Sequence, residues 1–194
     1  MSKKQMILEA ATKLFAKKDF REASMTELSV AAGVAESTIF YHFKTKETLF
    51  LAVLENTRIG IIEKFNSYME GKTFENGLTA VEGIVAFYLY AGETCEDWFL
   101  LLNRNYPYRL ALENSECLRH LEAIFNNHID TFEQAIRKGQ SDGSVGLMSP
   151  RNTAIILFAL TDSFVRCKNQ NMFEVGALYN DLINACRRML KPDK

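Results

Sequence analysis

The segment from Glu36 to His42 and the lysines that follow it carry side chains suited to contacts with nucleic acid. Carboxylate, hydroxyl and imidazole groups can exchange hydrogen bonds with base edges, and ammonium groups can neutralise phosphates. We therefore expect reversible DNA binding from this part of the chain. The candidate residues are Thr26, Glu36, Ser37, Thr38, Phe40, Tyr41, His42, Lys44 and Lys46.

Two short helices separated by Gly33 would position these side chains. Glycine accepts the left-handed backbone that ends a helix and allows a sharp turn. In the second helix, from Ala35 to Phe43, the apolar Ile39 and Phe43 lie four residues apart on one face. The polar residues are then left on the remaining faces. This pattern predicts a helix-turn-helix.

The first of these helices needs an apolar face and a cap. Thr26 can accept the hydrogen bond of an N-cap, and Ser24 is a second candidate for that role. The predicted apolar face consists of Leu28, Ala31 and Ala32.

Residues in the first quarter of the chain resemble the N-terminal signature of the TetR family of bacterial transcriptional regulators. The resemblance implies a repressor that binds a palindromic operator in double-stranded DNA as a homodimer, and that a small-molecule effector releases. It also implies a homodimer contact through the last two helices. The matching residues are Phe20, Thr26, Leu28, Ala32–Val34, Thr38–Phe43 and Lys46–Leu49.

The start of the predicted recognition helix and the start of the next helix have separate expected roles. Glu36 could accept a hydrogen bond from a cytosine amino group, or it could be a first-turn anion favoured by the helix dipole. We expect Lys46 to bind a phosphate together with free backbone N–H groups. Phe40 and Ala35 depart from the tyrosine and serine that relatives usually carry, so a hydroxyl contact and a helix cap are missing.

The composition favours an all-α fold. The chain has 194 residues, 47% of them hydrophobic, and only three prolines. No hairpin turn is flanked by alternating strand patterns. We predict a three-helix DNA-binding domain over residues 1–50 and a helical bundle for ligand binding and dimerisation over residues 51–194.

Apolar spacing predicts the individual helices. A first helix over about Lys3–Lys18 covers the helix-turn-helix, and a fourth begins after Thr45 as its cap. Further helices are expected at Leu78–Ala91, Glu96–Asn103 and Ser115–Lys138, and a pair after Ser149–Pro150. The run Ala154–Leu160 is apolar on all sides, so something must cover its second face. On the final helix the predicted stripe is Val175, Leu178, Leu182, Ala185, Cys186 and Met189.

Aromatic side chains concentrate in the middle of the chain and suit an aromatic or amphipathic organic effector. Core packing is the alternative for each of them. Asp162 lies in an apolar segment and needs a partner, which could be a ligand or Arg166 at the i,i+4 position. The candidate effector residues are Tyr88, Trp98, Phe99, Asn103, Tyr106, Phe125, His128, Asp162 and Arg166.

Other functional classes lack their signatures. The four cysteines have no metal-ligand spacing, and no catalytic triad, metalloprotease motif or phosphate loop is present. We expect no metal site, no cofactor, no catalytic residue and no membrane segment, and a cytoplasmic location. Two alternatives remain: a helical ligand-binding or interaction module without specific DNA binding, and a ligand-independent DNA binder whose aromatic interior is filled by its own side chains.

Overall fold

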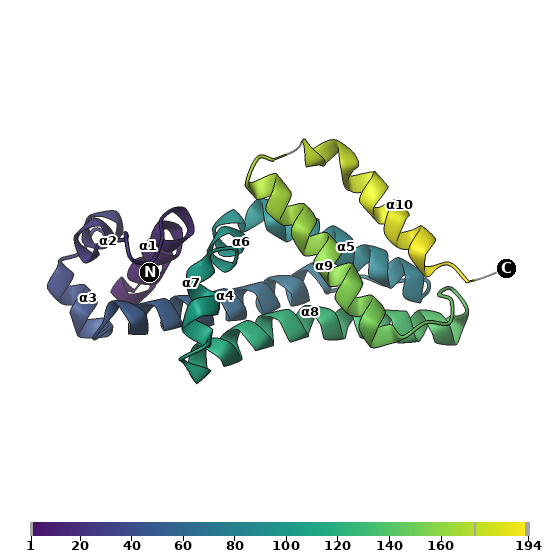
Figure 1. The fold of residues 1–194 in the computed structure, drawn as a ribbon, viewed down its shortest axis with the longest axis horizontal. Helices are drawn as coiled ribbons and strands as arrows, with labels where there is room; N and C mark the ends of the chain where they lie inside the picture. Colours follow the sequence, from purple (N-terminus) through teal and green to yellow (C-terminus); the bar gives the residue numbers. More distant parts are fainter. Residues whose placement is uncertain (1, 173, 193–194) are drawn as a thin grey trace. The chain divides into compact units, whose positions relative to one another are not determined.

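The computed structural model describes residues 2–172 and 174–192, and helices are their only regular secondary structure (Figure 1). This confirms the all-α prediction. In chain order the elements are α1 (Lys3–Lys17), α2 (Met25–Ala32), α3 (Glu36–His42), α4 (Lys46–Met69), α5 (Gly77–Thr94), α6 (Glu96–Leu102), α7 (Asn105–Ala111), α8 (Ser115–Asp142), α9 (Pro150–Asn169), the 3₁₀ helix η1 (Val175–Leu178) and α10 (Tyr179–Leu190).

The helices form two compact units. The first combines the residues up to Ile61 with Cys95–Ile124, and the second combines Ile62–Thr94 with the residues from Phe125 onward. Helices α4 and α8 therefore contribute one part to each unit. The division of function between residues 1–50 and 51–194 stays a prediction.

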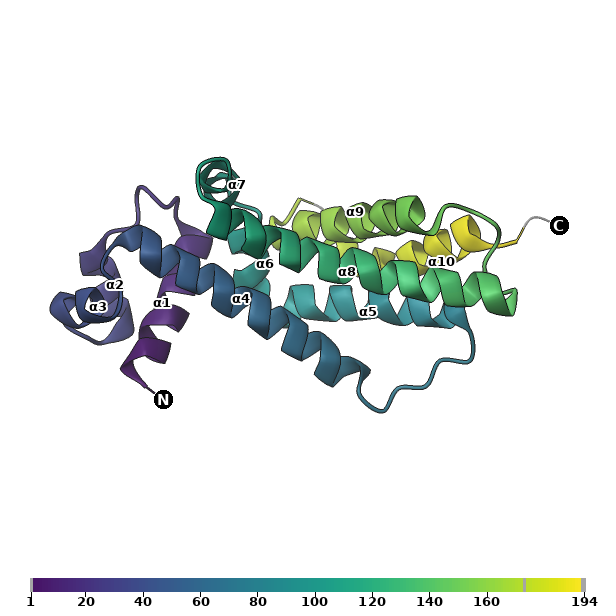
Figure 2. The same cartoon turned by 90° about the horizontal axis from the view of Figure 1, so that it is seen from below.

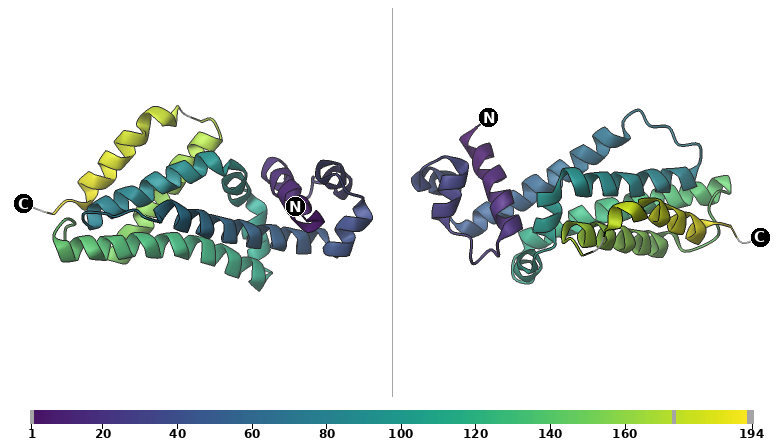
Figure 3. Two further views of the ribbon diagram at one scale, coloured as in Figure 1. Left: turned by 180° about the vertical axis from the view of Figure 1, so that it is seen from behind. Right: turned by 90° about the horizontal axis from the view of Figure 1, so that it is seen from above.

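In the first unit, helix α1 packs against α2 and α6 and buries one apolar stripe. Ile7, Ala11 and Phe15 are fully or almost fully buried, while Ala10 and Leu14 are half-buried. Figure 3 shows α1, α2 and α3 gathered together at the start of the chain. Helix α1 thus acts as the scaffold of the helix-turn-helix.

The cap of α2 is Ser24. Its hydroxyl accepts a hydrogen bond from the N–H of Glu27 at 3.0 Å, and the Glu27 carboxylate accepts from the N–H of Ser24 at 3.1 Å. The prediction of Thr26 as the cap was wrong, because this reciprocal capping box satisfies two free N–H groups from two positions earlier. Ala31 is exposed rather than part of the apolar face. Gly33 ends the helix as predicted, with φ of +64°.

One helix was not predicted, and another runs further than expected. The unpredicted helix is α7. Pro107 lies in the first turn of that helix, where a missing N–H breaks no helical hydrogen bond. Helix α8 continues through Gly139 to Asp142. Gly139 lies so close to Gly77 that a side chain on Gly77 would collide with its backbone.

Helix α5 is the centre of the second unit and packs against both α9 and α10. Its first turn is held by α8, since the N–H of Gly77 donates to the Asp142 carboxylate at 2.7 Å. On α10, Arg187 forms an ion pair with Glu82 of α5 at 2.6 Å. Figure 2 shows α5 and α9 running beside the C-terminal half of α8.

The last helices present apolar side chains outward. On α9, Ala154 and Leu157 are buried, whereas Ile155, Ile156 and Leu160 are between 40% and 54% exposed. The predicted final helix is split, because Leu178 belongs to η1 and α10 starts at Tyr179. Of its stripe, Leu182 and Cys186 are buried, while Leu178, Ala185 and Met189 are exposed. The side chain of Val175 lies outside the described part.

Candidate functional site

Helix α3 is anchored on one side and exposed on the other. Ile39 is completely buried and Phe43, which follows the helix, is 5% exposed. On the other side Ser37 is exposed, and Phe40 and Tyr41 are 41% and 76% exposed. The apolar anchor thus leaves the predicted DNA-contacting face free. Phe40 is a surface residue here.

The remaining residues of α3 contribute to its first and last turns. Glu36 and Thr38 are half-buried in the first turn, and His42 is half-buried in the last. Ala35 provides no side-chain cap, as expected from its residue type. The rings of His42 and Tyr41 meet edge to face with centroids 5.2 Å apart.

The start of α4 is capped and carries the predicted phosphate contact. Thr45 accepts a hydrogen bond from the N–H of Thr48 at 3.0 Å, which confirms Thr45 as the cap. The Nζ of Lys46 lies 4.5 Å from the ring centroid of Phe20. Burial lowers the pKa of Lys46, while Asp19 and Glu27 oppose that change. Lys44 and Thr26 are exposed.

An aromatic cluster joins this region to α7. The rings of Phe20 and Tyr106 stack with centroids 3.7 Å apart and planes 5° from parallel. Phe15 and Phe50 each lie within 5.6 Å of Phe20. Burial, with a smaller contribution from Glu47, raises the pKa of Tyr106 to about 12. Tyr106, a predicted effector residue, thus has one ring face occupied by Phe20.

Arg104 provides a second connection that the sequence did not reveal. Its Nε and Nη2 both donate hydrogen bonds to the carbonyl oxygen of Ala16, at 2.9 and 2.5 Å. That carbonyl belongs to the last turn of α1, where no helical N–H is available to it. The two residues are 88 positions apart, so no local pattern could have paired them.

The predicted effector residues fall into both units. Trp98, Phe99, Asn103 and Tyr106 belong to the first. Trp98 packs on α4 at Gly60, where an added Cβ would lie 2.5 Å from the indole ring. Phe99 is buried, and Asn103 is the half-buried residue that ends α6.

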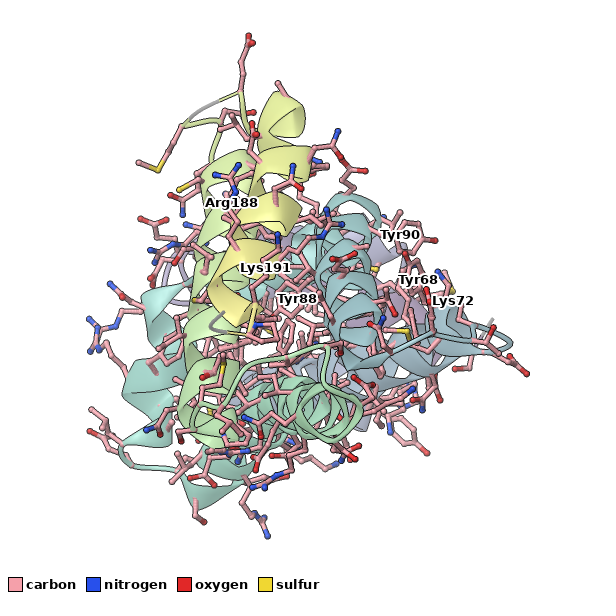
Figure 4. All side chains as sticks on the ribbon, turned by 90° about the vertical axis from the view of Figure 1, so that its right-hand side faces the viewer. Tyr68, Lys72, Tyr88, Tyr90, Arg188 and Lys191 are labelled. Atoms are coloured by element: carbon pink, nitrogen blue, oxygen red, sulfur yellow. The ribbon has the colours of Figure 1, made fainter. Side chains whose placement is uncertain are left out.

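In the second unit, Tyr88, Phe125 and His128 lie together. Tyr88 and His128 are 3% and 2% exposed, with ring centroids 4.8 Å apart. Phe158 of α9 completes the group at 5.9 Å from Tyr88 and 5.8 Å from Phe125. Figure 4 shows Tyr88 between the helices of this unit. Phe158 was not a predicted effector residue, although it lies one helical turn before Asp162.

Asp162 is half-buried on α9 and Arg166 is exposed. The described residues include no carboxylate-to-guanidinium contact within 4.0 Å between these two side chains, so the purely structural salt bridge is absent. Burial raises the pKa of Asp162, and the positive charge of Arg166 opposes this only in part. Asp162 therefore carries a desolvated carboxyl group without an ion-pair partner in the described structure.

Other chemistry finds little support among the described residues. The thiols of Cys117 and Cys186 are buried, and those of Cys95 and Cys167 are half-buried. Over residues 2–172 and 174–192 no group of three potential metal ligands is present. Nor does any helix of the described chain have the length and apolarity required to cross a membrane.

Residues 7–53 match the sequence profile described as bacterial regulatory proteins, tetR family. The HTH-type transcriptional regulator YerO of Bacillus subtilis is 36% identical over 53 residues, which are 27% of this chain and 18% of that protein. The chain thus spans less than a fifth of that relative. The fatty acid metabolism regulator protein of Bacillus subtilis is 22% identical over 185 residues, covering 93% of this chain and 92% of that protein.

The fold is similar to that of solved regulators. A transcriptional regulator from Saccharomonospora viridis, crystallised in complex with choline, superimposes with a TM-score of 0.80 at 17% identity. The superposition covers 96% of this chain and 94% of that one. The profile match ends at Val53, so it includes α1 to α3 and the start of α4.

Proposed function

Because this chain belongs to the TetR family of bacterial regulatory proteins, we propose that it is a ligand-responsive repressor that binds a palindromic operator as a homodimer. The observation that carries the proposal is the exposed face of α3 inside the matched segment, held by the buried Ile39. We assign DNA reading to residues 1–50 and effector binding and dimerisation to residues 51–194, in the cytoplasm.

Helix α3 would enter the major groove with its N-terminal residues toward the bases. Glu36, Ser37 and Thr38 then select the sequence, and Tyr41 and His42 extend the contact toward the backbone. The lysines act on phosphates. Lys44 is exposed. The Lys46 ammonium lies over the Phe20 ring, so it would bind a phosphate either while keeping this ring contact or after giving it up. Thr26 and Phe40 are exposed as well.

Dimerisation would cover the apolar side chains that α9 and α10 leave exposed. Ile156 is 54% exposed and Met189 is 40% exposed, and both lie on helices near the C-terminus. Stable interfaces bury more than about 1,000 Å² and are apolar at their centre. A dimer also supplies a second recognition helix for the second half of a palindrome.

The effector would be a small organic, aromatic or amphipathic molecule. A structural neighbour binds choline, and a relative is named for fatty acid metabolism, so small organic molecules are effector candidates for this fold. In the second unit the candidates are Tyr88, Phe125, His128, Asp162 and Arg166. The Asp162 carboxyl, without an ion-pair partner, supports a polar contact with the effector there.

The effector signal would reach the DNA-binding helices through α6 and α7. Trp98, Phe99 and Asn103 lie on or directly after α6, next to Arg104, which holds the end of α1. Tyr106 stacks on Phe20, just before α2. A ligand that displaces α6 would therefore move both contacts and shift the dimer between DNA-competent and incompetent states.

The proposal is tested by selecting duplexes from a random pool with the purified protein at two salt concentrations. We expect an enriched inverted repeat whose half-site spacing corresponds to one helical turn or a multiple of it. Glu36→Ala should relax base preference at one or two positions per half-site, costing about 1 to 3 kcal/mol on the preferred sequence. Ser67→Ala, on an exposed position of α4, is the matched control.

Two outcomes would count against the proposal. Selection of no sequence, also after removal of any co-purified effector by unfolding and refolding, would favour a helical interaction module without an operator. Enrichment of a single, non-repeated site would remove the homodimer and its palindrome. If the base preference of Glu36→Ala equals that of wild type, Glu36 does not contact bases and only interacts favourably with the helix dipole.

A further inference from the structure

The second unit contains an open groove of about 340 Å³ that none of the predicted effector residues lines. It is bounded by the end of α4, the first half of α5 and the C-terminal half of α8. This volume is at the lower end of the range of small-molecule sites, about 300 to 1,000 Å³. The apolar walls are formed by Phe65, Met69, Phe74 and Ile84.

The ring of Phe74 packs against α5 at Gly83. An added Cβ on Gly83 would collide with the Phe74 ring, so the glycine allows this ring to lie directly against the helix. On the α4 side, Phe65 is held by an edge-to-face contact with the buried Phe87 at 5.0 Å. Both aromatic walls are therefore fixed by contacts behind them, which favours a preformed site.

Two lysines, Lys72 and Lys138, border the groove. The Nζ of Lys138 lies 3.5 Å from the carbonyl oxygen of Phe74, and that of Lys72 lies 3.5 Å from the ring centroid of Tyr68. Figure 4 shows Lys72 and Tyr68 together at one side of the unit, away from Tyr88. Neither ammonium has a carboxylate within 4.0 Å in the described residues.

The positive charge of these lysines remains available. Several other cations of the unit are paired: Lys168 with Glu93, Arg187 with Glu82, and Arg137 with Glu133. Lys138 interacts electrostatically with the carboxylate of Asp142 without forming an ion pair. The oxygens of Asp142 already accept hydrogen bonds from the N–H groups of Gly77 and Ser144. The groove therefore combines an apolar floor with positive charge that no carboxylate pairs at its edge.

We propose that this groove binds an organic anion with an aliphatic tail, represented by a medium-chain alkyl carboxylate. The tail would lie between Phe65, Phe74 and Ile84, and the carboxylate would take hydrogen bonds from Lys72 and Lys138. The proposal concerns binding alone and goes beyond the proposed function, because it requires neither an operator nor a dimer. Its failure would leave DNA recognition untouched.

Isothermal titration calorimetry of the full chain with hexanoate, octanoate and decanoate tests the proposal. We expect one molecule per chain, with binding tightening about fourfold for each added methylene. Decanol should bind more weakly than decanoate, and decyltrimethylammonium should bind weakest because the lysines repel it. Equal affinity for the three decyl compounds would show that Lys72 and Lys138 do not contribute to binding. No binding of any chain length would remove the site.

Variants locate the site within the unit. The double variant Lys72→Met, Lys138→Met should weaken decanoate about fivefold to tenfold and leave decanol nearly unchanged. Lys64→Met is the matched control, since Lys64 lies on α4 over the Tyr90 ring and does not line the groove. Ala80→Phe should fill the groove and abolish binding of both compounds.

A second filling variant guards against misfolding. Gln134→Trp replaces an exposed lining residue, so it should block the groove while far-ultraviolet circular dichroism stays that of the wild type. Decanoate binding that persists in this folded variant, with unchanged affinity and stoichiometry, would place the ligand elsewhere and overturn the proposal.

Discussion

Phe20 and Tyr106 stack ring on ring, with their centroids 3.7 Å apart, although 86 positions separate them in the chain. Phe20 directly precedes the helix-turn-helix and Tyr106 lies in α7. Lys46 lies over the same phenylalanine ring. One aromatic side chain thus links a candidate phosphate contact to the helices that carry candidate effector residues.

Removal of this stack should destabilise the protein. Tyr106→Ala is expected to cost about 3 kcal/mol, because it deletes a large ring from a packed cluster and leaves a cavity. Equilibrium unfolding in urea measures the change. Tyr106→Phe keeps the ring and should stay within about 1 kcal/mol of wild type. Leu112→Ala, at an 86% exposed position close by, is the control and should be nearly neutral. A neutral Tyr106→Ala would contradict the packing role.

Lys46→Met should weaken binding to all DNA sequences by a similar factor. It should also reduce the slope of log affinity against log salt by about two for the dimer, since one phosphate contact is lost in each of the two half-sites. Methionine keeps the aliphatic stem near Phe20, so stability should change little. Fluorescence anisotropy over a salt series gives the slope. Lys64→Met, outside the matched segment, should leave it unchanged. If the salt slope of Lys46→Met equals that of Lys64→Met, Lys46 makes no phosphate contact and only packs on the Phe20 ring.

Charged substitutions on the outer face of α9 should dissociate the proposed dimer. Leu160→Glu is expected to give monomers at micromolar concentration, because an unpaired carboxylate would be buried at an apolar interface. Multi-angle light scattering reads the mass directly. Leu147→Glu is the control, since Leu147 is 96% exposed in the α8–α9 connection. A wild-type chain that is monomeric at the same concentration would remove the proposal itself.

Asp162→Asn should stabilise the protein at neutral pH. Burial raises the pKa of Asp162 in the folded state, so the folded state binds the proton more tightly than the unfolded state does. Stability therefore decreases as pH rises from the unfolded value of about 3.9 through the raised folded value, and stays lower above it. The amide avoids this loss, and we expect a Tm increase of about 2 °C at pH 7.

The difference between Asp162→Asn and wild type should become small at pH 3.5, below the unfolded pKa of about 3.9, because the aspartate is then mostly protonated in both states. Thermal unfolding at pH 3.5 and pH 7 makes the comparison. Arg166→Gln serves as a second variant, because loss of its positive charge should increase the wild-type penalty slightly. An Asn variant that is less stable at pH 7 would indicate a favourable partner for the carboxylate.

The helix-turn-helix was predictable because its signals are local. Gly33, the spacing of Ile39 and Phe43, and Thr45 before α4 each act within a few residues, and each has the predicted role. The cap of α2 was misassigned between Ser24 and Thr26 because both residue types can cap. Only the position of Glu27, three residues after Ser24, distinguishes them.

Contacts between distant residues could not be predicted. The bond from Arg104 to the Ala16 carbonyl and the contact between Gly77 and Gly139 depend on how helices pack. The groove bordered by Lys72 and Lys138 has the same origin, because its walls come from three helices and the α4–α5 connection. Aromatic residues concentrate in the sequence between positions 87 and 132, but composition does not separate those in a core from those that meet a ligand.

The bond between Arg104 and Ala16 has a consequence for protein engineering. Regulators that combine a new effector with a new operator can be built by joining the DNA-binding domain of one chain to the ligand-binding domain of another. Here a junction after residue 50 would leave the end of α1 without its guanidinium partner and Phe20 without Tyr106. A DNA-binding part that is moved to another chain must include Cys95–Ile124 as well. The unit to be transferred is therefore formed by two separate segments of the sequence.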